Sequence, residues 1–164
     1  VLAAGGLSKA YALPGLRVGW LVGPEAVLAD TWAYHDYTSI TAGILSNRIA
    51  AIALGPEQRP RILARNRALL AANLGLLRRW LEGYGPTFHT VPPRAGAMAF
   101  LRYALPVNST ELSDWLRTTR SVFVLAGDVF GMDGYIRLGI GGATAHLEAG
   151  LERFADGLRE RFGV

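Results

Sequence analysis

The chain of 164 residues contains no cysteine, and it contains a single lysine among its 17 basic residues. The absence of cysteine excludes disulfides and thiolate metal sites, and it is typical of cytoplasmic proteins. The three histidines are scattered without the spacing of metal ligands, so we predict no metal site. No apolar run reaches the roughly 18 residues that a membrane helix needs, and no secretory signal pattern is present. We therefore expect a cytoplasmic protein without a membrane partner.

Charged residues are also scarce, at 18% of the chain, whereas hydrophobic residues make up 51%. This balance predicts that other protein covers much of the surface. The net charge of +4 raises nucleic acid as a partner, but the arginines at 59, 61, 65 and 67 have the spacing of an ordinary solvated helix face. We predict no nucleic-acid binding. Because the chain begins inside an apolar run, we expect it to be the C-terminal part of a longer protein.

The one lysine, Lys9, stands where a functional amine is expected. The apolar run 1–4 ends at two glycines, so Lys9 follows the end of a predicted strand, and α/β sheets bind their ligands at strand ends. Arg17 precedes a second apolar run, 18–23. A buried amine can lose its proton and attack a carbonyl, and a guanidinium can bind phosphate through two hydrogen bonds. Lys9 is either a leftover surface lysine or the attachment point of a phosphorylated aldehyde, which points to pyridoxal phosphate.

The stretch Ser8–Trp20 begins with Ser-Lys and ends in Pro-Gly-Leu-Arg-Val-Gly-Trp. It resembles the cofactor-lysine motif of the class I/II aminotransferases, which are pyridoxal-phosphate enzymes of fold type I. The resemblance implies that Lys9 holds the cofactor as an imine and that Ser8 and Arg17 bind its phosphate. Gly6 stands where the family often has Ser or Thr, so either a backbone N–H replaces that hydroxyl or the phosphate is held less tightly.

Arg137 interrupts the apolar run 135–140, where a charge is costly unless it is paired. It could face solvent from an edge strand, pair with Asp128 or Asp133, or bind a carboxylate in two-pronged fashion. The order Phe-Gly followed by Tyr-Ile-Arg-Leu is similar to the aminotransferase segment whose arginine binds the substrate α-carboxylate. The resemblance therefore implies that Arg137 is a substrate-binding residue.

Hydrophobic periodicity and turn residues predict a mixed α/β chain, and the family resemblance implies the C-terminal part of a fold-type I transferase. We expect residues 1–55 to be the end of the large, cofactor-binding domain and its sheet. Residues 56–85 would form the long interdomain helix, and residues 86–164 the small α+β domain. The helices are predicted at 24–36, 38–54, 57–82, 109–117 and 144–161, and the strands at 1–4, 18–23, 87–91, 97–103, 122–125 and 135–140.

The resemblance implies an aminotransferase that moves an amino group between an amino acid and a 2-oxo acid, as a homodimer in its full-length form. Other pyridoxal-phosphate enzymes use the same residues: a cyclase of the capreomycidine synthase type, a lyase or a decarboxylase. An aminotransferase-like regulatory domain fused to a DNA-binding segment, and a non-catalytic remnant, are further alternatives. The product formed from an amino acid would separate the enzymes from one another.

Overall fold

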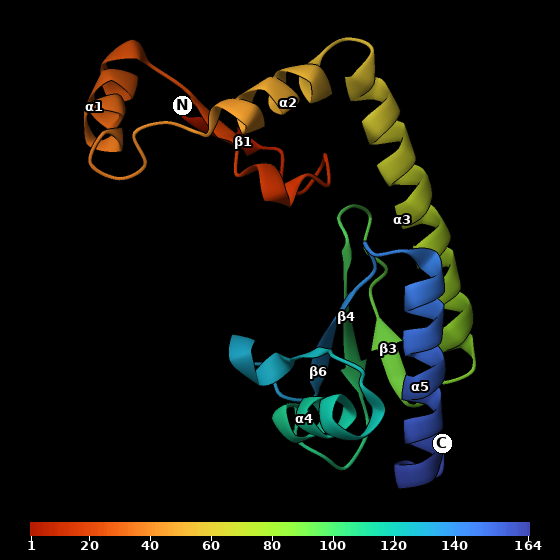
Figure 1. Cartoon of the computed structure of the whole chain (residues 1–164). Helices are drawn as coiled ribbons and strands as arrows, with labels where there is room; N and C mark the ends of the chain where they lie inside the picture. The colour runs from red at the N-terminus through yellow and green to blue at the C-terminus, as the bar shows by residue number, and fades with distance from the viewer. The chain divides into compact units, whose positions relative to one another are not determined.

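A computed structural model describes all 164 residues and divides the chain into two compact units, Val1–Arg67 and Ala68–Val164 (Figure 1). Helix α3 (Gln58–Glu82) contributes to both units. Its bounds agree with the helix predicted at 57–82. No helix combines the length and the apolar character that crossing a membrane requires.

In the first unit, strands β1 (Ala3–Gly6) and β2 (Gly19–Val22) form an antiparallel pair. The register places Gly6 opposite Gly19, so the loop that carries Lys9 leaves the ribbon at this end. A short 3-10 turn, η1 (Pro14–Leu16), lies within that loop. Helices α1 (Glu25–His35) and α2 (Ile44–Leu54) follow.

The helix predicted at 38–54 is shorter in the structure. The amides of Thr38, Ser39 and Ile40 all donate to the carbonyl of His35, which closes the end of α1 in a tight turn. Ile40 adopts a left-handed conformation, with φ of 59°, which no helix of L-residues continues through. Regular helix therefore begins only at Ile44.

The second unit is built on a four-stranded antiparallel sheet in the order β3-β4-β6-β5. The strands are β3 (Phe88–Thr90), β4 (Met98–Tyr103), β5 (Leu125–Ala126) and β6 (Tyr135–Gly139). Helices α4 (Ser109–Arg120) and α5 (Thr144–Phe162) complete it, with a 3-10 turn η2 (Gly127–Phe130) after β5.

One face of this sheet is buried. Along β6, Ile136 and Leu138 are buried and alternate with the half-buried Arg137, as a period of two requires. Side chains of α4 and α5 and of the end of α3 cover the buried face and form one continuous core. Its largest fully buried members are Leu77, Leu101, Leu112, Leu116, Ile136, Ile140, Phe154 and Leu158.

Most of the segment predicted as a strand at 122–125 does not form a strand in the structure. Val122 and Val124 are buried, but only Leu125–Ala126 pairs with β6. The amide of Val122 instead donates to the carbonyl of Leu116 and closes the end of α4. The apolar run reflects burial in the core rather than sheet pairing.

Candidate active site

The loop after β1 is held at its base and leaves Lys9 exposed. Leu7 is fully buried, its amide donates to the carbonyl of Val18 over 3.1 Å, and its own carbonyl accepts from the amide of Leu13 over 3.0 Å. The amide of Ala12 donates to the carbonyl of Lys9 over 3.0 Å, so the lysine begins a tight turn. The side chain of Lys9 therefore lies on a loop whose two ends are fixed.

An open hollow of about 500 Å³ borders this loop. Ser8 and Lys9 line it together, and Trp20 of β2 forms another part of its wall. A Cβ atom at Gly5 would lie 2.4 Å from the indole of Trp20, so glycine at this position lets the ring lie against the backbone of β1. The complete lining is Ala4, Gly5, Gly6, Ser8, Lys9, Ala10, Tyr11 and Trp20.

Arg17 lies at the end of η1, in the same unit, but it is not among the residues that line the hollow. Its backbone is left-handed, with φ of 53° and ψ of 39°, and its Nη1 donates to the carbonyl of Pro14 over 3.1 Å. Its side chain is exposed and forms no ion pair. The guanidinium therefore keeps donors free for an anion.

The charge around the hollow favours an anionic ligand. Residues 1–24 include Lys9 and Arg17 but no aspartate or glutamate. An amine, the hydroxyl of Ser8 and a guanidinium are the donors that a phosphate-bearing aldehyde requires. The residues present thus fit pyridoxal phosphate in their chemistry.

Arg137 lies in the second unit, at the middle of β6 between Phe100 of β4 and Leu125 of β5. Its guanidinium carbon is 5.1 Å from the ring centre of Phe130 in η2. The Phe100 ring stacks on Tyr135 at 5.0 Å and meets Phe130 edge-on at 6.1 Å. Arg137 is thus bordered by aromatic rings on the sheet face opposite the core.

The structure contradicts two of the alternative roles for Arg137. The strand that carries it has neighbours on both sides, so it is not an edge strand. Asp128 accepts from the hydroxyl of Thr110, and Asp133 accepts from the amides of Ser109 and Gly134. These two amides lower the pKa of the Asp133 carboxyl, Ser109 having the larger effect. Neither acid pairs with Arg137, and its role in carboxylate binding remains a prediction.

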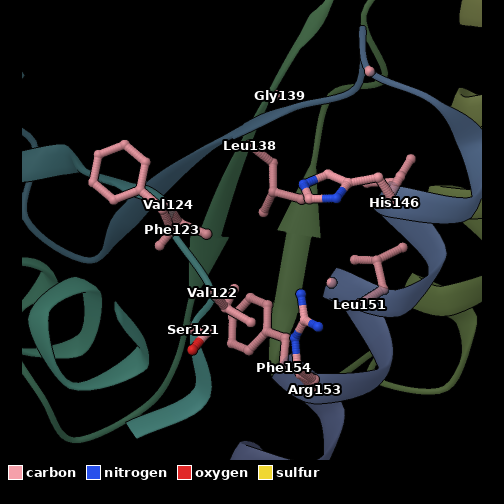
Figure 2. A pocket seen from close by; sticks show the side chains of 13 residues that line it. Ser121, Val122, Phe123, Val124, Leu138, Gly139, His146, Leu151, Arg153 and Phe154 are labelled. Atoms are coloured by element: carbon pink, nitrogen blue, oxygen red, sulfur yellow. The ribbon is translucent and has the colours of Figure 1, made fainter. Parts of the chain in front are cut away.

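A second, smaller hollow of about 120 Å³ lies in the second unit (Figure 2). Residues 121–124, the end of β6 and α5 surround it, and His146 and Arg153 contribute its nitrogen-bearing side chains. It is lined by Leu138, which lies on the buried face of β6, and by none of the predicted site residues. This hollow is therefore separate from the face that carries Arg137.

The structure brings Ser8 and Lys9 together, keeps Arg17 in the same unit, and places Arg137 in the other unit. Sequence reasoning missed the Phe130 ring beside Arg137. It also missed two asparagines of α3, Asn66 and Asn73, which donate to backbone carbonyls of the segments that carry Lys9 and Arg137. Their positions, seven residues apart on a helix, were the available signal.

Comparison with known proteins agrees with this arrangement. The family model described as aminotransferase class I and II matches residues 1–154. Capreomycidine synthase of Streptomyces vinaceus is 32% identical over 158 residues, which cover 96% of this chain and 40% of that protein. A crystal structure of a PLP-dependent aminotransferase from Streptococcus suis superposes with a TM-score of 0.91 at 33% identity, covering 97% of this chain and 42% of that one. The PLP-dependent cyclase OrfR superposes with a TM-score of 0.88 at 29% identity, covering 98% and 43%.

The chain thus spans about two fifths of the length of these relatives. The match extends from the lysine loop to α5 and includes both units. The expected fold, a C-terminal portion of a fold-type I transferase, is confirmed. This chain belongs to the class I and II aminotransferase family.

Proposed function

We propose that the chain is the C-terminal part of a pyridoxal-phosphate-dependent aminotransferase that exchanges an amino group between an amino acid and a 2-oxo acid. The observation that supports this most strongly is the single lysine of the chain, exposed beside an open hollow in a region matched by the family model. The other sixteen basic residues of the chain are all arginine, whose guanidinium differs from an amine in its chemistry. The one lysine supplies the primary amine that can bind an aldehyde covalently, which a guanidinium does not.

The residues of the first unit would hold the cofactor. Lys9 would bind it covalently through Nζ, and Ser8 and Arg17 would bind its phosphate. When bound, pyridoxal phosphate supplies an electron-withdrawing ring that stabilises negative charge at the substrate Cα. The open hollow beside Ser8 and Lys9 offers room for such a ring.

Two residues of this chain would then act on the amino acid. The Arg137 guanidinium would bind the α-carboxylate through two parallel hydrogen bonds and so fix the orientation of Cα. The Lys9 amine would act as the general base and acid that moves the proton from the substrate Cα. General acid–base catalysis of this kind contributes about 10²–10⁴-fold to a rate.

The domain assignment, the assembly and the location belong to the same proposal. Residues 1–55 would complete the large domain, 56–85 would form the interdomain helix and 86–164 the small domain. The full-length protein would be a cytoplasmic homodimer. Exposed apolar side chains of α1 and α2, including Trp32, Tyr34, Ile44 and Ile52, support burial of the first unit by further protein.

A cyclase is the second candidate. Two of the relatives described above are named capreomycidine synthase and PLP-dependent cyclase. A cyclase would use Lys9 and Arg137 in the same roles and would differ in the product. Transamination releases a 2-oxo acid and leaves the amino group on the cofactor, whereas a cyclase returns a ring-closed amino acid.

The decisive experiment is reductive trapping in the full-length protein. Borohydride treatment in the presence of pyridoxal phosphate, followed by peptide mass spectrometry, should locate the adduct on Lys9. The variant Lys9→Arg keeps the positive charge but cannot form the adduct, so it is the matched control. An adduct on another residue, or on none, would refute the proposal.

The role of Arg137 is tested separately. Arg137→Lys keeps the charge but loses the two-pronged geometry, and a lost charge-assisted hydrogen bond costs about 1.5–3 kcal/mol. The KM for the amino acid should rise by about one to two orders of magnitude. Analysis of the products, as 2-oxo acid or cyclised amino acid, assigns the reaction in the same assay.

A further inference from the structure

Helix α3 carries three polar side chains at intervals of seven residues: Arg59, Asn66 and Asn73. Seven residues make almost two turns of an α-helix, so neighbours in this series lie on nearly the same side. Each of the three donates a hydrogen bond to a segment outside the helix. Of the three, Arg59 is exposed, Asn66 is half-buried and Asn73 is fully buried, so Asn73 is the member whose polar side chain is costly unless it is bonded.

Two members of the series bind the lysine loop. Arg59 Nε donates to the hydroxyl of Tyr11 over 3.1 Å, and Asn66 Nδ2 donates to the carbonyl of Ala10 over 2.9 Å. Ala10 is the residue directly after Lys9. Arg65 donates to the other end of the same amide through Nε and Nη2, at 3.2 and 3.1 Å. The orientation of the Asn66 amide is thereby fixed, with its nitrogen toward the loop.

The third member binds the end of the strand that carries Arg137. Asn73 is fully buried, and its Nδ2 donates to the carbonyls of Ile140 and Gly142 over 2.8 and 2.9 Å. The amide of Ile140 donates to the carbonyl of Ala97 over 2.8 Å, so both sides of this backbone segment are bonded. The chain is thus fixed three residues beyond Arg137.

The amide of Asn73 is retained at a cost. Its Oδ1 is buried without a hydrogen-bond partner. A leucine would fill the same space without a buried oxygen, but it would leave the carbonyls of Ile140 and Gly142 without their donor. Asn73 supplies the donor that these two carbonyls would otherwise lack, so it both stabilises the end of β6 and fixes its backbone.

We infer that Asn66 and Asn73 are positioning residues, Asn66 for the amine of Lys9 and Asn73 for the guanidinium of Arg137. The inference rests on the proposed function, because it assigns the two side chains to the cofactor lysine and the carboxylate-binding arginine. Each asparagine acts through a backbone carbonyl and touches neither substrate nor cofactor.

The test for Asn66 uses a variant of equal shape. Asn66→Asp keeps the acceptor for Arg65 but removes the donor to Ala10, and Arg67→Ala, in the next position and exposed, is the control. In the cofactor-free full-length protein, the amides of residues 10–13 should exchange hydrogen about three- to tenfold faster in Asn66→Asp. Trapping of pyridoxal phosphate at Lys9 should slow by a similar factor, and the affinity for a Cα-methyl amino acid should stay unchanged in the loaded protein.

For Asn73, we expect substrate binding to change and trapping at Lys9 to stay the same. Asn73→Ala should raise the KM for the amino acid about tenfold while the trapping rate at Lys9 stays within twofold of wild type. Its control is Asn108→Ala, which removes the side-chain cap of α4 in the same unit and so lowers stability without removing a contact to the segment that Asn73 binds. At matched folded fractions, Asn108→Ala should leave KM unchanged.

The outcomes separate the two proposals. The inference is supported if Asn66→Asp slows trapping at Lys9 without changing substrate affinity, and Asn73→Ala raises KM without slowing trapping. If Asn66→Asp and Asn73→Ala lower trapping and turnover only in proportion to their unfolded fractions, with KM unchanged as expected for Asn108→Ala, the asparagines are merely structural and the inference is wrong. An adduct at Lys9 with no effect of Asn66→Asp overturns the inference and leaves the proposed function intact. Absence of an adduct at Lys9 in the wild-type protein overturns both.

Discussion

The ring of Phe130 should strengthen carboxylate binding by holding the guanidinium of Arg137 in place. The guanidinium carbon lies 5.1 Å from the ring centre, within the range of a cation–π interaction. Phe130 is 47% exposed, so the interaction belongs to the weaker, solvated class of about 0.5–1 kcal/mol. Phe130→Leu keeps an apolar side chain near Phe100 but has no ring quadrupole.

Removal of this interaction should weaken amino-acid binding by about two- to fivefold, which is 0.5–1 kcal/mol converted to an equilibrium constant. Titration calorimetry with a Cα-methyl amino acid measures binding without proton abstraction at Cα. The full-length protein loaded with pyridoxal phosphate is the sample, and kcat with an ordinary amino acid should stay close to wild type.

The matched control for this substitution is Phe123→Leu. Phe123 belongs to the same unit and is 73% exposed, and no cation–π contact joins it to Arg137. The reasoning is refuted if Phe130→Leu binds the probe as tightly as wild type, or if Phe123→Leu weakens binding to the same extent.

Three further substitutions test the backbone and the pH dependence. Gly127→Ala would place a Cβ atom 2.0 Å from the carbonyl oxygen of Met132, so the free energy of unfolding should fall by about 3 kcal/mol or more, seen as a lower urea midpoint. Ala12→Gly should raise the free energy of unfolding by about 0.5–1 kcal/mol, because Ala12 has φ of 54° and glycine adopts this conformation without a steric penalty; a lower melting temperature would contradict this. The amide of Ser109 is the main cause that lowers the pKa of the Asp133 carboxyl. The ionised carboxylate therefore stabilises the fold above its ordinary pKa near 4, and this stabilisation is lost as the pH falls through the folded-state pKa. Asp133→Asn should therefore be less stable than wild type at pH 7, and the difference should shrink as the pH falls below about 4; a difference that stays constant with pH would disprove the assignment.

Local signals in the sequence were sufficient for most of the elements and for the lysine loop. The long helix was predicted at 57–82 and is found at Gln58–Glu82, because its apolar spacing is continuous and it is followed by glycine. The motif around Lys9 is one continuous stretch of sequence, so its residues stay near one another because they are close in the chain. The exposure of Lys9 beside a hollow follows from the paired strands on either side.

The features that the sequence analysis did not predict depend on contacts between residues that are distant in the chain. Asn73 is a polar residue among the apolar residues of α3. A polar side chain by itself suggests exposure to solvent, yet Asn73 is completely buried. Its partners, Ile140 and Gly142, are more than sixty residues away in the chain. In the same way, Phe130 approaches Arg137 because η2 folds back beside β6, which no local pattern indicates.

The exposed position of the solitary side-chain amine has a chemical consequence for handling this protein. Within these 164 residues, reagents that acylate or cross-link lysine, such as succinimide dyes, aldehyde fixatives and glycating sugars, have one side-chain target, and that target is the proposed reactive group. Lysine-directed labelling of this region would therefore modify the proposed reactive amine and abolish activity, unless that amine is already bound to a ligand. A bound vitamin B6 aldehyde would protect the residue that it uses.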